Sequence, residues 1–307
     1  MNKGSLKNSL LLFLAAFIWG VAFVSQSKGM EYMGPFTFNG VRSLIGSAVL
    51  IPVILVRRKK EGVNRKPIPW KVTLLGGACC GLALMTASTL QQIGMLYTTV
   101  GKAGFITALY IIFVPILGIF IGKKVPVTVW VGALMAAVGM YLLCIQGSFR
   151  IGLGDGLVFL CAIVFSIHIL VIDYFSPKAD GVMLSCIQFL VCGVICTTCA
   201  LLFEKPSFAQ LLSGAVPILY AGVMSCGVAY TLQIVGQKNV NPTVAALILS
   251  LESVVSMLAG WFAYKVGFLK EDQTLTALQL LGCAIVFAAV VLVQLPLEKF
   301  RKKKRPA

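Results

Sequence analysis

The sequence predicts an all-α integral membrane protein in which ten transmembrane helices form two inverted-topology repeats of five helices each. Three observations lead to this prediction: the composition, ten long apolar runs, and residues that recur between the two halves of the chain. Of the 307 residues, 59% are hydrophobic and only 12% are charged, and the mean hydropathy is +0.94. Soluble domains carry about a quarter charged residues, and disordered segments are polar. The composition therefore excludes both of these classes.

The apolar runs give the positions of the helices. A helix needs about 20 apolar residues to cross the bilayer core. Ten runs fit this requirement: 8–27, 35–56, 71–96, 101–121, 126–146, 153–174, 181–203, 213–236, 243–265 and 275–295. The first run follows Lys3 and Lys7 as in a signal peptide, but its cleavage pattern of small residues is weak, so we expect an uncleaved helix. The breaks between the runs are too short for a soluble domain.

The basic residues predict the orientation of the chain. The 26 Lys and Arg against 10 Asp and Glu give a net charge of +16, which could indicate a nucleic-acid partner. With the N-terminus inside, however, 19 of the 26 lie on the cytoplasmic side, six lie outside, and Arg42 lies within a span. This asymmetry follows the positive-inside rule and predicts a multi-pass protein of the plasma membrane with both termini in the cytoplasm. The basic tail at 297–307 is then a topology determinant in contact with lipid headgroups, not a nucleic-acid arm.

Internal similarity divides the chain into two repeats, 1–147 and 148–296. An offset of 142 residues aligns 87–123 with 229–265, and an offset of 146 aligns the first apolar run with the sixth. Identical pairs include Gln91/Gln233, Gly94/Gly236 and Lys123/Lys265. Because each repeat has an odd number of spans, the second repeat inserts upside down relative to the first. Such inverted repeats are typical of secondary transporters, in which the two halves exchange conformations around a central site.

Four segments carry a resemblance to a known family: Ala15-Ala16-Phe17-Ile18-Trp19-Gly20, Asn39-Gly40-Val41-Arg42, Phe105-Ile106-Thr107-Ala108-Leu109-Tyr110 with Val114-Pro115, and Leu249-Ser250-Leu251-Glu252. In their order and spacing, over about residues 8–295, the chain resembles the EamA-like transporters of the drug/metabolite transporter superfamily. The resemblance implies a ten-helix bundle with a central cavity that moves small metabolites, often amino acids or related compounds, and often outward. The chain departs from the family at Ser253, where Pro is common, and at Lys123 and Lys265, where Glu is common. These departures put an ion-coupling role of the two span ends in doubt.

Two charged residues and the lone histidine lie well inside the spans, where a charge costs about 2.5–3.5 kcal/mol. Glu252, near the middle of the ninth span, could bind an ammonium group or carry a proton, or it could bond a neighbouring helix. Arg42 in the second span could bind a carboxylate, form a structural pair, or reach the headgroups by snorkelling. His168 in the sixth span could relay protons or make a structural hydrogen bond. All three are candidates for proton or charge coupling.

Polar pairs in the third and eighth spans give further candidates for substrate binding. Ser88 lies three residues before Gln91, and Tyr230 lies three residues before Gln233, so each pair shares one helix face. The alternative is hydrogen bonding between helices, which contributes about 0.6 kcal/mol per bond in membranes. Aromatic residues of the first and fourth spans, Trp19 and Tyr110, could form a wall of the cavity or simply pack. In the fourth span Pro115 should kink the helix and could act as a hinge.

The cysteines do not point to a cofactor. All ten lie in apolar runs, and Cys192, Cys196 and Cys199 share one helix face without a nearby His or carboxylate. Because Cys commonly serves as a small buried apolar residue, we expect packing, no metal site and no cofactor.

The sequence as a whole favours a secondary transporter of small metabolites, such as amino acids or related amphipathic compounds, that works by alternating access. Its expected partners are the small-molecule substrate and the lipid bilayer, with no nucleic acid, and the oligomeric state stays open. One alternative is an integral-membrane enzyme acting on lipid or prenyl substrates, but the sequence has no acidic cluster or metal-ligand set for that chemistry. A second alternative is a channel or a membrane scaffold without transport activity, although a channel favours a polar-lined pore. We therefore expect no enzymatic activity.

Overall fold

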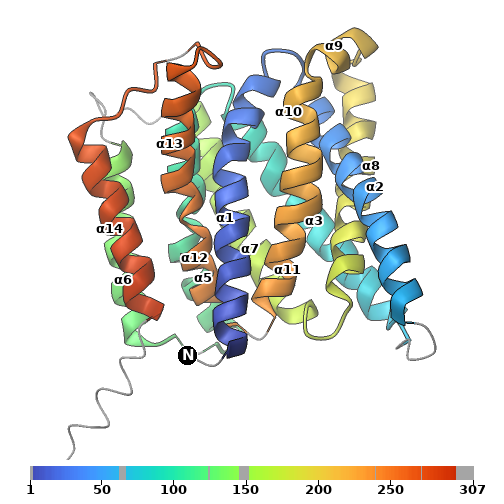
Figure 1. Cartoon of the computed structure of the whole chain (residues 1–307), viewed down its shortest axis with the longest axis horizontal. Helices are drawn as coiled ribbons and strands as arrows, with labels where there is room; N and C mark the ends of the chain where they lie inside the picture. Colours follow the sequence, from blue (N-terminus) through green and yellow to red (C-terminus); the bar gives the residue numbers. More distant parts are fainter. Residues whose placement is uncertain are drawn as a thin grey trace, which may run out of the picture.

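The computed structural model is a bundle of roughly parallel helices (Figure 1), and it describes residues 3–61, 67–123, 125–144, 152–238, 240–270 and 272–294. No residue in these ranges is in a strand, so the all-helical prediction is confirmed for them. The elements are α1 Lys3–Gly29, α2 Pro35–Glu61, α3 Trp70–Gly94, α4 Val100–Ala108, α5 Tyr110–Phe120, α6 Val127–Cys144, α7 Leu153–Phe175, α8 Gly181–Phe203, α9 Phe208–Ser213, α10 Ala215–Leu219, the π-helix η2 Tyr220–Ala229, α11 Tyr230–Gln237, α12 Pro242–Leu249, α13 Glu252–Lys265 and α14 Ala277–Gln294.

Eight helical stretches in the described ranges are long and apolar enough to cross a membrane. They are Leu6–Gly29, Pro35–Glu61, Trp70–Gly94, Val100–Phe120, Leu153–Phe175, Gly181–Phe203, Ala215–Gln237 and Pro242–Lys265. Two shorter apolar helices, Val127–Gly139 and Ala277–Leu292, stand at the predicted fifth and tenth spans. The outer surface of the bundle is apolar: Phe120, Phe203 and many other large apolar side chains are exposed. Such a surface suits contact with lipid rather than with water.

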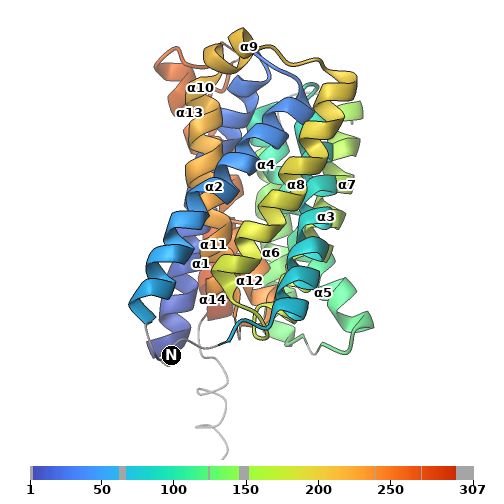
Figure 2. The same ribbon diagram turned by 90° about the vertical axis from the view of Figure 1, so that its right-hand side faces the viewer.

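The bundle has two ends, which Figures 1 and 2 show in two views. We call the end where α1 begins the N-terminal end, and the opposite end, where α9 lies, the α9 end. The long helices alternate in direction between these two ends. One edge of the bundle is formed by α2 packed on α8 and the other by α6 packed on α14, with α1, α3, α7 and the interrupted helices between them. The centre of the bundle is therefore enclosed by helices from both halves of the sequence.

The predicted fourth and ninth spans are each interrupted near their middle. The fourth span divides at Leu109 into α4 and α5, and the ninth divides at Ser250 and Leu251 into α12 and α13. Offset by 142 residues, Leu109 and Leu251 are equivalent positions of the two halves. Pro115 lies inside α5, six residues beyond the interruption, so the break in the fourth span does not coincide with the predicted kink. A hinge role of Pro115 stays a prediction.

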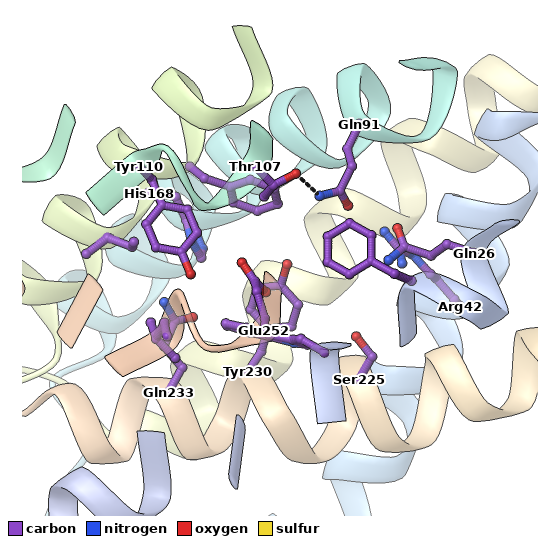
Figure 3. A pocket seen from close by; sticks show the side chains of 15 residues that line it. Gln26, Arg42, Gln91, Thr107, Tyr110, His168, Ser225, Tyr230, Gln233 and Glu252 are labelled. Carbon is purple, nitrogen blue, oxygen red and sulfur yellow. Dashed lines mark hydrogen bonds between the residues drawn. The ribbon is translucent and has the colours of Figure 1, made fainter. Parts of the chain in front are cut away.

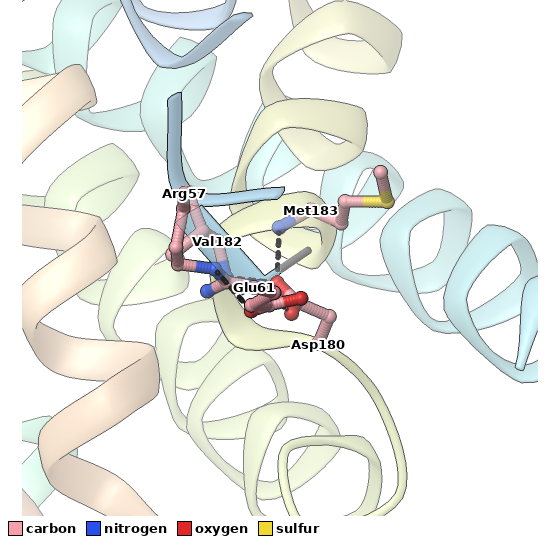
Figure 4. Close-up of polar contacts among 5 residues, drawn as sticks. All are labelled: Arg57, Glu61, Asp180, Val182 and Met183. Carbon is pink, nitrogen blue, oxygen red and sulfur yellow. Dashed lines mark hydrogen bonds and ion pairs between the residues drawn. The ribbon is translucent and has the colours of Figure 1, made fainter. Parts of the chain in front are cut away.

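Acidic residues hold α2 against α8 at both ends of the pair. At the N-terminal end, Asp180 accepts hydrogen bonds from the backbone amides of Val182 and Met183 and forms an ion pair with Arg57 of α2 (Figure 4). At the α9 end, Glu204 follows α8 and accepts hydrogen bonds from the first free amides of α2. A carboxylate at a helix N-terminus satisfies free backbone donors and interacts favourably with the helix dipole.

Candidate functional site: a central polar cavity

A small cavity lies at the centre of the bundle, with a volume of about 30 Å³. Fifteen residues line it: Trp19, Phe23, Gln26, Arg42, Gln91, Thr107, Tyr110, Phe165, His168, Ile169, Ser225, Tyr230, Gln233, Leu249 and Glu252. They come from α1, α2, α3, α4, α5, α7, η2, α11, α12 and α13, and thus from both halves of the chain (Figure 3). A cavity of this size holds water. A metabolite would need the helices to move apart.

The two helix interruptions place a polar residue at the cavity from each half. Tyr110 is the first residue of α5 and Glu252 the first of α13, so each begins the half-helix that follows a break. Both are nearly fully buried, with 3% and 4% of their surface exposed. The Tyr110 hydroxyl points toward the Glu252 carboxylate (Figure 3), and it is buried without a hydrogen-bond partner among the described residues. Within the described residues Glu252 forms no ion pair. The side chain that points toward its carboxylate is the neutral phenol of Tyr110 (Figure 3).

Arg42 supplies a positive charge to the same cavity. It is 6% exposed and lies on α2, one turn beyond Phe38, and its guanidinium lies 5.4 Å from the Phe38 ring centroid. Among the described residues Arg42 has no carboxylate partner. Tyr230 interacts electrostatically with both Arg42 and Glu252, which places it within reach of both charges. A cation–π contact offsets only part of the cost of burying a guanidinium.

His168 and two glutamines add further hydrogen-bonding groups. His168 Nε2 lies 3.1 Å from Gln188 Oε1, which makes Nε2 the donor and leaves Nδ1 as an acceptor without a described partner. Gln91 Nε2 donates to Thr107 Oγ1 at 2.9 Å (Figure 3), so its amide is fixed by α4. Gln233 Oε1 is buried and has no partner among the described residues. A buried acceptor without a partner is costly, and it is therefore available to a ligand donor.

Aromatic rings form one wall of the cavity. The rings of Trp19 and Tyr230 are tilted with centroids 4.5 Å apart, and Tyr230 also makes edge contacts with His168 and Phe189. The Trp19 Nε1 donor is buried without a described partner. The wall therefore combines apolar ring faces with one free N–H group, a combination that suits an amphipathic ligand.

Most candidates from the sequence meet at this cavity. Eight of the ten predicted site residues line it: Trp19, Arg42, Gln91, Tyr110, His168, Tyr230, Gln233 and Glu252. Ser88 does not, because it is buried with its hydroxyl bonded to the Met85 carbonyl one turn back. Pro115 lies outside the lining as well.

Sequence reasoning missed seven lining residues: Phe23, Gln26, Thr107, Phe165, Ile169, Ser225 and Leu249. Only Gln26 carried a usable signal, as an amide within an apolar run. It is buried, and its Oε1 has no described partner. The others are apolar or small and look like ordinary packing residues in a sequence.

The described residues contain no group of three or more His, Cys, Asp or Glu side chains arranged to hold a metal ion. Nine cysteines whose side chains the structure describes are free thiols, and all nine lie within helices. Ser43 donates to the Cys192 sulfur at 3.4 Å, which fits a packing role for this residue.

The fold and the cavity define a multi-spanning membrane protein with a polar centre that is shared by two halves of the chain. The EamA-like transporter family matches residues 6–145 and 152–295, so nearly the whole chain is covered by two successive matches. The chain belongs to the EamA-like transporter family, and it is a membrane protein of the drug/metabolite transporter type.

Several relatives carry transporter names. An uncharacterized transporter of Archaeoglobus fulgidus is 31% identical over 92% of this chain and 84% of its own length. The uncharacterized transporter YoaV of Bacillus subtilis is 23% identical over 83% of this chain and 88% of its own length. A WAT1-related chloroplastic protein of Arabidopsis thaliana is 22% identical over 96% of this chain and 71% of its own length. A solved crystal structure with 20% identity has a TM-score of 0.72 and covers 97% of this chain and 99% of that one, which shows a shared fold.

Proposed function

We propose that the chain is a secondary transporter that exports amino acids or related zwitterionic, amphipathic metabolites across the plasma membrane by alternating access. The observation that carries the proposal is the pair of oppositely charged, unpaired side chains, Arg42 and Glu252, that line one buried cavity between the two halves. Lys and Arg in the short connections favour the N-terminal end as the cytoplasmic one.

The arrangement of the helices supports an inverted repeat at 1–147 and 148–296. Under exchange of the halves, the packing of α3 on α7 corresponds to that of α11 on α1, and both pairs are in contact. The approaches to the neighbouring backbone agree: a Cβ on Gly94 would lie 2.9 Å from the Gly154 carbonyl oxygen, and one on the equivalent Gly236 would lie 3.1 Å from that of Asn8. The first contact is at the α9 end and the second at the N-terminal end. Both ends are thus closed in a similar way, as in an intermediate between the two open states.

The two buried charges support a zwitterionic substrate. A charge inside the membrane costs about 2.5–3.5 kcal/mol or more when it lacks a partner. A ligand carboxylate at Arg42 and a ligand ammonium at Glu252 would offset both costs at once, whereas a ligand of one charge would leave one side chain unpaired. The Gln233 carbonyl could accept a further bond from the ammonium, and Trp19 Nε1 could donate to the carboxylate. Binding energy of this kind discriminates against analogues that lack one charge.

The same residues are suited to couple transport to charge or proton movement. Glu252 can carry a proton when no ammonium is bound, Arg42 fixes the charge balance of the cavity, and the His168 ring meets Tyr230 in an edge contact. Coupling through Glu252 would make export depend on the proton gradient. Because a protonated carboxyl no longer attracts an ammonium, a proton and the substrate would compete for this side chain.

Counterflow in proteoliposomes tests the proposal. Proteoliposomes that contain the purified protein are loaded with amino acids of several classes. Uptake of the same amino acid in labelled form is then measured, together with uptake of its decarboxylated and deaminated analogues. The native chain should accumulate the zwitterion at least tenfold over both analogues. Glu252→Gln and Arg42→Gln should each reduce accumulation of the zwitterion at least tenfold. Arg42→Gln should also lose any preference for the deaminated analogue, which keeps the carboxylate, over the decarboxylated analogue, which keeps the ammonium. Glu31→Gln, an exposed residue at the α9 end, is the matched control.

Accumulation by counterflow requires a carrier, so flux without counterflow would indicate a channel and contradict alternating access. Full activity of both charge variants would instead contradict the assignment of the site, and absence of flux for every zwitterion would contradict the substrate class.

A further inference from the structure

The two interrupted helices are equivalent in position but not in how they are held. The α4–α5 helix is attached to α7 by ion pairs near both of its ends. At the α9 end, Lys102 Nζ of α4 lies 2.6 Å from Asp155 Oδ2 of α7, and Thr98 Oγ1 donates to the other carboxylate oxygen at 2.8 Å. At the N-terminal end, Lys123, which follows α5, has its Nζ 2.5 Å from Asp173 Oδ2 of α7.

These ion pairs lie where charges are less exposed than on an open surface. The Asp155 and Asp173 side chains are 9% and 12% exposed, and the two lysines are 35% and 39% exposed. Partial burial reduces screening by solvent and salt. Two attachment points near opposite ends of one helix pair also fix its relative orientation, which a single point cannot do. The α4–α5 helix and α7 are therefore held as one unit.

The other half has no such attachment. With the offsets of 142 and 146, the positions equivalent to Lys102 and Asp155 are Val244 and Ser9, and the position equivalent to Asp173 is Ser27. Glu252 and Lys265 are the only charged residues of α12 and α13, and neither forms an ion pair within the described part of the chain. Among the described residues, no ion pair therefore joins α12–α13 to α1, although Lys28 Nζ of α1 lies 5.6 Å from the ring centroid of Phe268, which follows α13.

The contacts of α13 with its two neighbours are instead close approaches of its side chains to glycines. A Cβ on Gly104 of α4 would lie 2.2 Å from Ser256 Oγ, and a Cβ on Gly20 of α1 would lie 2.4 Å from Val255 Cβ. Glycines thus face α13 from both neighbours, whereas the equivalent positions are Ala246 and Ser166. In the same half, η2 packs on α1, α2 and α11 and is a π-helix whose equivalent segment in α3 is an ordinary α-helix. Stretches of π-helix occur often at functional sites, and their hydrogen bonds are less regular.

From these differences we infer that alternating access in this protein is asymmetric: α4–α5 and α7 form a fixed wall, and α12–α13 of the other half, which also contains η2, is the moving element that carries Glu252. This inference rests on the proposed alternating-access function and adds which half moves. In such a cycle the Glu252 carboxylate changes its distance from Tyr110 and Arg42, so the charges of the site separate or approach as one end opens.

Hydrogen–deuterium exchange of the full chain in lipid nanodiscs, without substrate, tests the inference. The two breaks provide a comparison within one molecule, because residues 107–113 and 249–255 are equivalent and both largely buried. We expect the amides of 249–255 and of η2 to exchange at least tenfold faster than those of 107–113, since exchange follows local opening. Equal exchange at the two breaks, or faster exchange at 107–113, would overturn the inference.

The ion pairs Lys102–Asp155 and Lys123–Asp173, which we call the clamp, can be removed for a second, independent measurement. The double variant Asp155→Asn with Asp173→Asn keeps the shape of both side chains and removes both ion pairs, so exchange at 107–113 should rise at least threefold. Asp272→Asn is the matched control, because Asp272 is exposed and hydrogen bonds from Thr274 lower its pKa, so this variant also removes an ionised carboxylate. If the double variant does not fold, Lys102→Gln tests one clamp alone.

An increase in the control as large as that in the clamp variant, or no increase in either, would contradict the clamp. Exchange needs no substrate, so a negative result here leaves the counterflow assay unaffected, and absence of transport leaves the exchange comparison interpretable.

Discussion

Glu204 should be one of the most important residues for stability, although it lies far from the cavity. It accepts hydrogen bonds from Phe36 N at 2.8 Å, Thr37 N at 2.7 Å and Thr37 Oγ1 at 2.6 Å. Pro35 has no N–H, and Phe38 N is bonded to the Gly34 carbonyl. Glu204 therefore satisfies the two remaining free amides in the first turn of α2, across a junction between the two halves of the sequence.

The magnitude follows from these bonds. Hydrogen bonds to a charged group contribute about 1.5–3 kcal/mol each, but Glu204 is only half-buried, so water can replace part of the loss in Glu204→Ala. We expect a loss of about 2–3 kcal/mol in the free energy of unfolding, with about half of that in Glu204→Gln, which keeps one acceptor oxygen. With about 2–4 °C per kcal/mol for domains of 150–250 residues, the unfolding temperature should fall by about 4–12 °C.

A thiol-reactive fluorophore gives the assay, because several cysteines are buried in the native chain and become reactive as it unfolds. The scan is made in detergent and compared with Glu31→Gln. Glu31 is an exposed glutamate at the same end that pairs with Lys28, and such surface pairs contribute at most about 1 kcal/mol. If Glu204→Ala unfolds within 1 °C of this control, the carboxylate does not hold α2 in the way that its hydrogen bonds indicate.

Two further predictions concern the bundle and the cavity. Gly94→Val should lower the unfolding temperature by several degrees, because its Cβ would lie 2.6 Å from Val158 Cγ2 and overpacking costs about 1–3 kcal/mol. The control Gly156→Ala places no atom within 4 Å of its Cβ, so it should leave the unfolding temperature unchanged or raise it in the same scan. Gln91→Leu removes one polar group of the cavity and one hydrogen bond, to Thr107. It should therefore weaken apparent substrate affinity in the counterflow assay by about tenfold and change the unfolding temperature by no more than about 2 °C. An unchanged affinity would exclude Gln91 from the binding site.

The positions of the spans could be predicted because the membrane makes one requirement that a sequence displays directly, which is a long apolar run. The two interruptions could not be predicted in the same way. Leu109 and Leu251 are good helix formers, and no Gly or Pro marks either break, although Leu251 has polar neighbours in Ser250 and Glu252. The one proline nearby, Pro115, lies inside α5. At the second break, Ser250 Oγ donates to the Leu247 carbonyl and Ser253 Oγ donates to the Ser250 carbonyl, which are local bonds of the kind that bend helices.

The candidate site was predictable to the extent that it is polar. Arg42, Glu252 and Gln233 stood out because a polar group is costly inside a membrane, and all three line the cavity. Ser88 gave a similar signal, but its hydroxyl can bond the carbonyl of its own helix, and it does so. The apolar walls, such as Phe23 and Ile169, carry no signal at all, because an apolar residue that faces a cavity and one that faces a neighbouring helix look alike in the sequence.

The difference between the two halves bears directly on function. A duplicated fold supplies two similar ends that can open in turn, but a cavity lined by identical residues from both halves would place like charges opposite each other. Here the position equivalent to Glu252 is Tyr110, and the position equivalent to Arg42 is Gln188. Under the proposed function, one positive and one negative group would therefore remain for the ligand. In the proposed mechanism, a symmetric backbone would allow the two ends to open in turn, while the differing side chains would allow recognition of a zwitterion.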